Sequence, residues 1–254
     1  MILAIDIGNT NIVISCIDKQ KTYFIERIST DRSKTELEYA IMFKNVLDIY
    51  QMDAAVLDGG IVCSVVPQIT QIVRLAAEKI IHKKVLVLGP GIKTGMNIMI
   101  DNPAQVGGDL IAAAVGAVAE YPTPLIIIDM GTATTVTVVD GKKNFIGGMI
   151  LPGIRTSLDA LTANAAQLSG IDLVPPKRVI GRNTIECMKS GIINSNAAAV
   201  DGMITRIEEE LGCKATAVAT GGLAKSIIPY CKEKVILDDD LLMKGLLIIY
   251  EKNR

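Results

Sequence analysis

Aromatic side chains are scarce in this chain, which has no tryptophan and only 4% aromatic residues. Half of its 254 residues are nevertheless hydrophobic, so the core must be built from isoleucine, valine, leucine, alanine and methionine. Long runs of isoleucine and valine are typical of strands buried on both faces, as in sheets that are covered by helices. The length allows one large domain or two ordinary ones, each with its own core.

Other shortages exclude several kinds of site. His82 is the only histidine, so a histidine-containing catalytic triad and a histidine-rich metal centre are excluded. The 26 basic and 27 acidic residues nearly balance and form no dense basic stripe, which argues against a nucleic-acid partner. The five cysteines include no C-x-x-C pair, which favours reduced, buried thiols over zinc ligands or disulfides.

Long apolar runs are also missing. None approaches the roughly 20 residues that a membrane-spanning helix needs. The first residues lack a basic region and reach an acid at Asp6, which argues against a signal peptide. We therefore expect a cytoplasmic protein with no membrane partner.

The order of predicted elements repeats along the chain. In the first half, strands are predicted at 2–7, 11–18 and 21–28, followed by helices and strands at 35–50, 54–66, 67–82, 85–88 and 111–118. In the second half, strands at 125–129, 134–139 and 144–150 precede segments at 154–165, 184–211, 215–219 and 241–250. This repetition indicates an α/β fold of two similar units around a central cleft. We place the boundary between residues 116 and 122, which gives domains 1–118 and 119–254.

Two glycine turns occupy corresponding places in the two halves. An apolar run, an aspartate, a glycine and small polar residues follow one another in Ile5-Asp6-Ile7-Gly8-Asn9-Thr10 and in Ile128-Asp129-Met130-Gly131-Thr132-Ala133-Thr134-Thr135. Glycine lets backbone N–H groups approach a ligand closely, so such a turn can cradle phosphate. The aspartate can bind or orient a cation that screens the phosphate. One copy is also an ordinary hairpin corner, but two copies favour a nucleotide-dependent phosphotransferase or ATPase.

A third candidate lies between the halves, where Gly107-Gly108-Asp109-Leu110 leads into an apolar helix predicted at 111–118. Asp109 stands at the expected N-cap of that helix, where a carboxylate accepts backbone N–H bonds. Its alternative role is that of a base, aimed from a helix N-terminus into the cleft and able to accept a proton from a substrate hydroxyl.

In this order, the motifs resemble those of the type III pantothenate kinases, members of the acetate and sugar kinase, Hsp70 and actin superfamily. The resemblance covers nearly the whole chain. The first turn, Gly107-Gly108-Asp109 and the second turn are similar to the family's first phosphate, pantothenate and second phosphate motifs. Residues 147–154 are similar to its interface motif, and Thr220-Gly221-Gly222 to its adenosine motif. The resemblance implies two ribonuclease H-like, actin-like ATPase domains with a central nucleotide cleft.

The same resemblance implies an activity, the ATP-dependent phosphorylation of pantothenate to 4′-phosphopantothenate, which is the first step of coenzyme A biosynthesis. Asp109 would accept the proton of the pantothenate hydroxyl. Asp129 would bind potassium or ammonium, and ATP would arrive with Mg²⁺. The substrate-binding residues would be Gly107, Gly108, Asp109, Leu110 and, across a homodimer interface that shares the pocket, Thr184. The ATP-binding residues would be Asp6, Ile7, Gly8, Asn9, Thr10, Asn11, Ile12, Val13 and Thr132.

Three positions depart from the family's pattern. Leu110 stands where the family usually has arginine, Ile100 where it often has tyrosine, and Thr137 where it often has aspartate. The arginine would supply charge to the pantothenate carboxylate, so another small-molecule kinase of the superfamily is one alternative. A regulatory protein that binds nucleotide without turnover is a second, although the retention of three motif aspartates argues against it.

Two further motifs are interpreted as structural. Cys63-Ser64-Val65-Val66-Pro67 is predicted to end a strand and start a helix. Asp238-Asp239-Asp240 is predicted to form the acidic N-terminus of a helix. Neither is assigned to the site.

Overall fold

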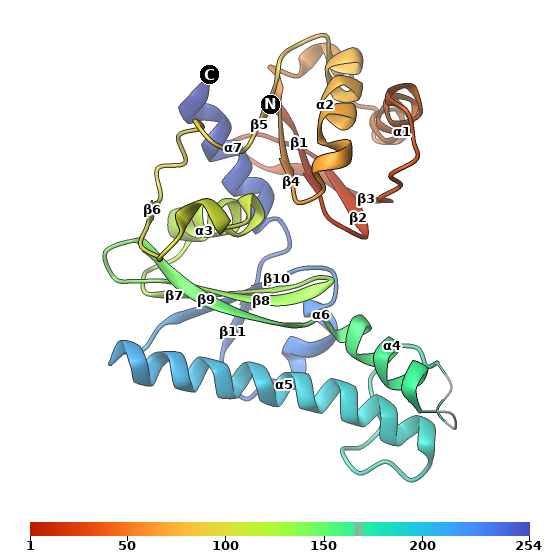
Figure 1. The fold of residues 1–254 in the computed structure, drawn as a ribbon, viewed down its shortest axis with the longest axis vertical. Helices are drawn as coiled ribbons and strands as arrows, with labels where there is room; N and C mark the ends of the chain where they lie inside the picture. Colours follow the sequence, from red (N-terminus) through yellow and green to blue (C-terminus); the bar gives the residue numbers. More distant parts are fainter. Residues whose placement is uncertain (166–167, 169) are drawn as a thin grey trace. The chain divides into compact units, whose positions relative to one another are not determined.

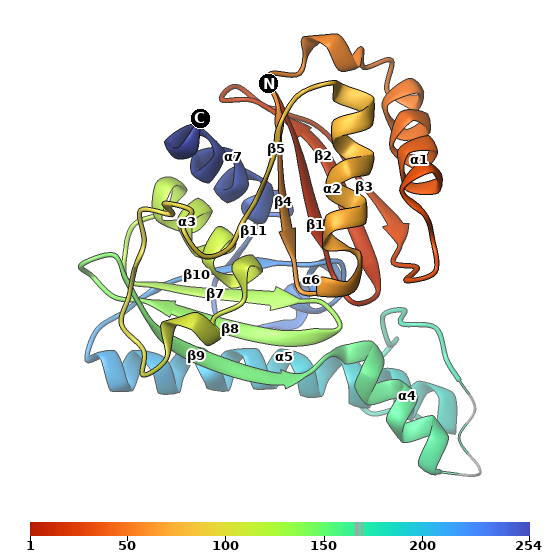
Figure 2. The same cartoon turned by 45° about the horizontal axis from the view of Figure 1, so that its top comes forward.

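The computed structural model, which describes residues 1–165, 168 and 170–254, divides the chain into two compact units. The first unit contains Met1–Met96, Asp101–Ala119 and Asp240–Arg254, and the second contains Asn97–Ile100 and Glu120–Asp239. Figures 1 and 2 show the course of the chain through its strands and helices. Within the described residues, every helix is too short or too polar to cross a membrane.

A five-stranded sheet forms the centre of the first unit, with strand order β3-β2-β1-β4-β5. The first three strands form an antiparallel meander, whereas β1, β4 and β5 run parallel to one another. The segment predicted at 54–66 becomes a strand only from Gly60, after a short 3₁₀ helix at Ala54–Val56. The strand bounds are β1 (Ile2–Ile7), β2 (Asn11–Ile17), β3 (Thr22–Ser29), β4 (Gly60–Ser64) and β5 (Val85–Val87).

Helices cover both faces of this sheet. Alternate residues of β1 point to opposite faces. Leu3, Ile5 and Ile7 are buried in a cluster with α1 (Glu36–Ile49) and α2 (Pro67–Ile81). Ile2 and Ala4 are buried in a second cluster with α3 (Gly108–Glu120) and α7 (Leu241–Asn253). Burial on both faces explains why β1 is almost continuously apolar.

The sheet of the second unit repeats the first. Its order is β11-β10-β7-β8-β9-β6, with β7, β8 and β9 as the antiparallel meander and β10 and β11 parallel to β7. Apart from the two-residue β6, the arrangement is the same as in the first unit, so the predicted duplication is confirmed. The strand bounds are β6 (Asn97–Ile98), β7 (Leu125–Met130), β8 (Ala133–Val139), β9 (Asn144–Pro152), β10 (Thr216–Thr220) and β11 (Val235–Leu237).

One long helix, α5 (Thr184–Leu211), lies along a face of this second sheet (Figure 1). Its bounds are those predicted from the sequence. The Asn183 side chain caps its start by accepting from the Glu186 N–H, and Gly212 ends it in the left-handed conformation. The smaller helices of this unit are α4 (Ile154–Asn164), α6 (Ala224–Ile227) and a 3₁₀ turn at Ile228–Tyr230; a further 3₁₀ turn, Pro103–Gln105, precedes α3 in the first unit.

The C-terminal helix α7 belongs to the first unit, whereas a division into 1–118 and 119–254 places it with the second half of the chain. Two glycines allow α7 to cross α3 at close range. A Cβ on Gly245 would lie 1.8 Å from the Ala112 carbonyl oxygen, and one on Gly116 would lie 2.2 Å from the Leu241 carbonyl oxygen. The two backbones therefore touch where side chains would otherwise keep them apart.

Gly245→Ala is expected to lower the free energy of unfolding by about 1–3 kcal/mol, because the added methyl group forces α7 away from α3. Gly191→Ala is the matched control, since a Cβ on Gly191 in α5 meets nothing within 4 Å. Alanine there should stabilise by up to about 1 kcal/mol through helix propensity. Urea unfolding of both variants checks this, and a Gly245→Ala protein as stable as wild type would contradict the close crossing.

Candidate active site

The first candidate loop joins β1 to β2. Ile7 and Ile12 form the last pair of the antiparallel ladder, and the Gly8 N–H donates to the Asn11 carbonyl oxygen at 3.0 Å. A Cβ on Gly8 would lie 3.0 Å from that same oxygen, so glycine relieves a tight turn. Thr30, the residue after β3, is hydrogen-bonded to the loop. Its hydroxyl donates to the Gly8 carbonyl oxygen at 2.6 Å, and its N–H donates to the Thr10 carbonyl oxygen at 3.0 Å.

The residues predicted to bind ATP at this loop differ in how far their side chains are exposed to solvent. Ile7 and Ile12 are fully buried in the core, so they can offer a ligand only their backbone groups. Asp6, Gly8 and Val13 are half-buried. The exposed polar residues of the turn are Asn9, Thr10 and Asn11.

Asp6 lies opposite Cys63 of the neighbouring parallel strand β4, on the sheet face that α3 covers. Cys63 is fully buried, and its thiol is hydrogen-bonded to the Asp6 carboxylate. Burial raises the pKa of this thiol well above its usual range, and the negative charges of Asp6 and Asp109 raise it further. The thiol therefore stays protonated and donates to Asp6.

Asp109 lies in the first turn of α3, which begins at Gly108, so its predicted placement at the N-cap is wrong. The Ile111 N–H already bonds to the Gly107 carbonyl oxygen at 3.2 Å, which gives Gly107 the capping place. The Asp109 Oδ1 accepts from the Leu110 N–H at 2.9 Å. Burial raises the pKa of the Asp109 carboxyl, while bonds from backbone N–H groups oppose that rise.

Two glycines at this helix start are closely packed against Asp109 and Cys63. A Cβ on Gly107 would lie 2.3 Å from the Asp109 Oδ1, and one on Gly108 would lie 3.1 Å from the Cys63 Sγ. A side chain at Gly107 would displace the Asp109 carboxylate, and one at Gly108 would press on the Cys63 thiol. The first unit therefore gathers a glycine turn and two carboxylates around one thiol.

The second loop joins β7 to β8 in the same way. The Gly131 N–H donates to the Ala133 carbonyl oxygen at 3.0 Å, and half-buried Asp129 is paired with Thr135. Thr132 is exposed, and its carbonyl oxygen accepts from the Thr156 hydroxyl at 2.9 Å. A Cβ on Gly153 would lie only 2.2 Å from that carbonyl oxygen, so this glycine lets the start of α4 close on the loop.

The segment Thr220-Gly221-Gly222 lies beside Asp129, because Thr220 pairs with Asp129 in the parallel ladder of β10 and β7. Gly221 has φ +94°, and a Cβ there would lie 2.5 Å from the Asp129 Oδ1. Both the backbone conformation and the contact require glycine. The second unit therefore has its own group of candidate residues around one carboxylate.

The other predicted positions lie at the edges of these groups. Leu110 is half-buried next to Asp109, and Thr184 is the exposed first residue of α5. Ile100 precedes the 3₁₀ turn before α3 and is half-buried, while Thr137 is buried within β8. Cys63, which the sequence interpretation left outside the site, is the residue it missed. Its only sequence signal is its position at the end of a strand parallel to β1.

The carboxylates of the candidate site are potential ligands for a cation. In the described part of the chain, histidine, cysteine, aspartate and glutamate side chains form no group of three that could hold a metal ion. Asp6 and Asp129 each fit a cation that takes its remaining ligands from phosphate, carbonyl or water oxygens, which hard cations accept.

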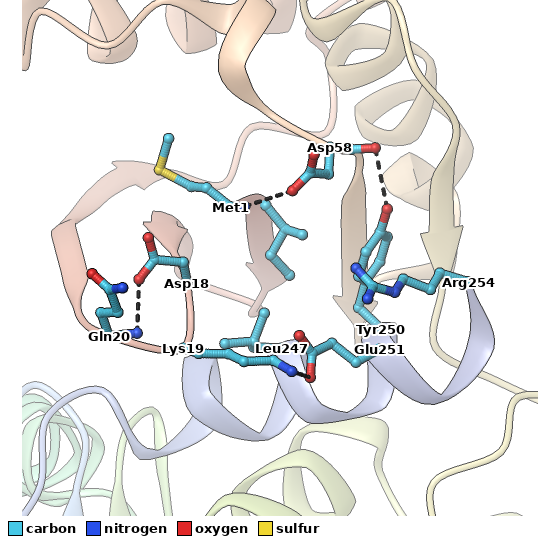
Figure 3. A pocket seen from close by; sticks show the side chains of 10 residues that line it. Met1, Asp18, Lys19, Gln20, Asp58, Leu247, Tyr250, Glu251 and Arg254 are labelled. Atoms are coloured by element: carbon cyan, nitrogen blue, oxygen red, sulfur yellow. Dashed lines mark hydrogen bonds and ion pairs between the residues drawn. The ribbon is translucent and has the colours of Figure 1, made fainter.

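A cavity of about 240 Å³ lies elsewhere in the first unit, around the start of β1 (Figure 3). Its charged groups are largely paired with one another: the Met1 amino group with Asp58 at 2.7 Å, and Lys19 with Glu251 at 3.2 Å. The glycine turn follows the other end of β1, about 17 Å along the strand. This cavity is therefore not assigned to the candidate site.

Comparisons with known proteins agree with this arrangement. A family model for type III pantothenate kinase matches residues 2–206. Type III pantothenate kinases of Exiguobacterium sp. strain AT1b and Moorella thermoacetica are each 42% identical over the whole of both chains. The solved structure of MreB 5 of Spiroplasma citri, bound to AMPPNP, has a TM-score of 0.53 at 10% identity, covering 99% of this chain and 96% of that one. This last likeness supports the predicted actin-like fold class.

Proposed function

Because the chain belongs to the type III pantothenate kinase family, it is a kinase that phosphorylates pantothenate in coenzyme A biosynthesis, and we propose which of its residues carry the reaction. The observation that supports this assignment is the cluster of Asp6, Cys63 and Asp109 beside the first glycine turn. Phosphoryl transfer depends on positioning and on stabilising charge more than on covalent chemistry. Such a cluster can supply both.

ATP binds at the first turn, through residues 6–13, and Thr132 contributes from the second turn. Backbone N–H groups and the exposed Asn9, Thr10 and Asn11 side chains offer donors to phosphate oxygens. The Mg²⁺ that accompanies ATP supplies charge screening, with the Asp6 carboxylate as the protein group that orients it. Cys63 keeps that carboxylate in place by its hydrogen bond.

Asp109 is the base. As the pantothenate hydroxyl oxygen bonds to the terminal phosphorus of ATP and the bond to ADP breaks, the hydroxyl proton passes to the Asp109 carboxylate. Its raised pKa makes the carboxylate a better proton acceptor than an ordinary aspartate. Gly107, Gly108 and Leu110, its neighbours in the chain, are the other residues that we assign to the substrate.

Pantothenate-dependent ADP release by the purified protein tests this assignment. Asp109→Asn is expected to lower turnover at least about a hundredfold while ATP binding stays near wild type, as for loss of a general base. In the wild type, kcat/KM should fall as pH falls through the raised pKa of Asp109, because protonation removes the base; that acid limb should be missing in the variant.

The control is Asp48→Asn, which removes an exposed carboxylate from α1 and should leave turnover unchanged. Near-normal turnover of Asp109→Asn would remove Asp109 from the mechanism. ADP release with a different acceptor only would favour another small-molecule kinase, and ATP binding without release would favour a regulatory protein.

A monovalent cation binds near Asp129. This carboxylate is half-buried in the strand before the second glycine turn and lies against the backbone of Gly221. A negative charge close to nucleotide phosphate is unfavourable unless a cation lies between them. Potassium or ammonium, being weakly hydrated, suits a place with one carboxylate and several neutral oxygens.

Activity is therefore expected to rise when sodium is exchanged for potassium or ammonium at constant ionic strength. Asp129→Ala should abolish that response more completely than Asp6→Ala, which should mainly raise the KM for ATP. Initial rates across a cation series provide the measurement, and thermal unfolding checks that both variants fold. A wild type indifferent to the monovalent ion would show the Asp129 assignment to be wrong.

The protein acts as a homodimer whose acceptor pocket includes Thr184 of the neighbouring subunit. Support comes from β9, where the side chain of Ile150 is 77% exposed and Met149 is also exposed. Beyond Phe145, β9 has no outer strand partner among the described residues. An apolar strand edge of this kind is covered when a second copy packs against it.

Ile150→Glu is expected to convert the dimer to a monomer and to lower activity, because each pocket would lose the Thr184 that completes it. Ile49→Glu is the matched control, since Ile49 is equally exposed, at 73%, but lies on α1. Sedimentation velocity at assay concentrations measures the effect. A fully active monomer of the wild type would contradict the shared pocket.

A further inference from the structure

The segment that follows β3 is fastened to the first glycine turn. Ser29 is the last residue of β3 in the ladder and pairs with Asn11. The next residue, Thr30, makes two hydrogen bonds to the turn, through its hydroxyl to the Gly8 carbonyl oxygen at 2.6 Å and through its N–H to the Thr10 carbonyl oxygen at 3.0 Å. Residues 31–34 therefore start from a point fixed on the turn.

The same segment is fastened to the core on its other side. Tyr39 of α1 is fully buried, and its hydroxyl donates to the Asp31 carbonyl oxygen at 2.7 Å while accepting from the Asp31 N–H at 3.1 Å. A capping box between Thr35 and Glu38 closes the segment at the start of α1. The backbone of Arg32 is thus held between two anchored ends.

Arg32 is the residue of this segment whose side chain contacts the turn. Its Nη2 donates to the Asn9 Oδ1 at 3.3 Å, and its side chain is otherwise exposed. The neighbouring Asp31 carboxylate is engaged by Ser33 and by Lys34, whose Nζ lies 3.0 Å away. Within the part of the chain described, no carboxylate forms an ion pair with Arg32.

An arginine in this position has further N–H donors with which to bind an anion. The guanidinium carries five N–H donors, of which Asn9 takes one. Its planar fork matches two oxygens of a phosphate group. The half-buried Asp6 carboxylate at the base of the turn repels a phosphate chain, and a positive charge at the rim offsets that repulsion.

We propose that Arg32 is a phosphate-binding residue, which contacts the phosphate chain of the nucleotide at the first glycine turn while Asn9 orients its guanidinium. This inference rests on the proposed function in one respect, namely that the turn binds ATP. Arg32 lies outside the sequence motif of the turn and would add a positive charge to the phosphate site. Thr30 and Tyr39 hold its segment in place.

Arg32→Gln tests the proposal through the binding of three probes: ATP, inorganic tripolyphosphate and adenosine. The variant should bind ATP and tripolyphosphate at least about tenfold more weakly, in line with the loss of charge-assisted hydrogen bonds. Its affinity for adenosine should stay unchanged. Arg32→Lys keeps the charge without the fork and should fall between the two. In turnover, the KM for ATP should rise while the KM for pantothenate stays constant.

Arg206→Gln is the matched control, because it removes an exposed arginine whose guanidinium donates to the Gly202 carbonyl oxygen of its own helix. It should bind all three probes as the wild type does. Wild-type affinity of Arg32→Gln for ATP and tripolyphosphate would overturn the inference, even if pantothenate-dependent ADP release upholds the proposed function. Equal weakening of ATP and adenosine would also overturn it, since that pattern indicates a general distortion. A wild type that binds neither ATP nor tripolyphosphate would overturn the proposed function together with it.

Discussion

The hydrogen bond from the buried Cys63 thiol to the Asp6 carboxylate is the interaction on which the candidate site of the first unit depends. Half-buried carboxylates cost free energy unless they are hydrogen-bonded, and Cys63 supplies a donor to Asp6. The donor is in place because parallel β1 and β4 pair Asp6 with Cys63. The start of α3 packs closely on the same thiol, since a Cβ on Gly108 would lie 3.1 Å from its sulfur. The Asp6 side chain, which precedes the glycine turn, is thus fixed by several elements. A binding site requires side chains that are held in place in this way.

Duplication explains the general plan, and divergence explains the different environments of the two aspartates. Asp6 and Asp129 occupy equivalent strands of the two sheets. In the first unit the parallel neighbour supplies a thiol. In the second, Thr220 is the paired residue, and Gly221 after it packs its backbone directly against the Asp129 carboxylate. One carboxylate is therefore next to a buried thiol, while the other is next to a glycine backbone.

The departures from the family's pattern fall outside the two glycine turns. Leu110 follows the proposed base, Ile100 precedes the connection to α3, and Thr137 is buried inside β8. If Leu110 contacts the acceptor as we propose, it adds apolar surface where arginine would add charge. The backbone glycines that shape this place, Gly107 and Gly108, are retained.

The sequence by itself determined the order and type of nearly all long elements, because each is set by local periodicity and by its own end signals. The strand at 2–7 is predicted to the residue and the helix from about 184 to 211 closely, since a buried apolar run and helical spacing are local patterns. The two glycine turns and Asp109 could also be named from the sequence. Only the tertiary structure decided that α7 joins the first unit, because a backbone contact between Gly245 and Ala112 leaves no local pattern. It alone brought Cys63 to Asp6 and Arg32 to Asn9, since strand register and hydrogen bonds between distant segments arise from packing rather than from spacing along the chain.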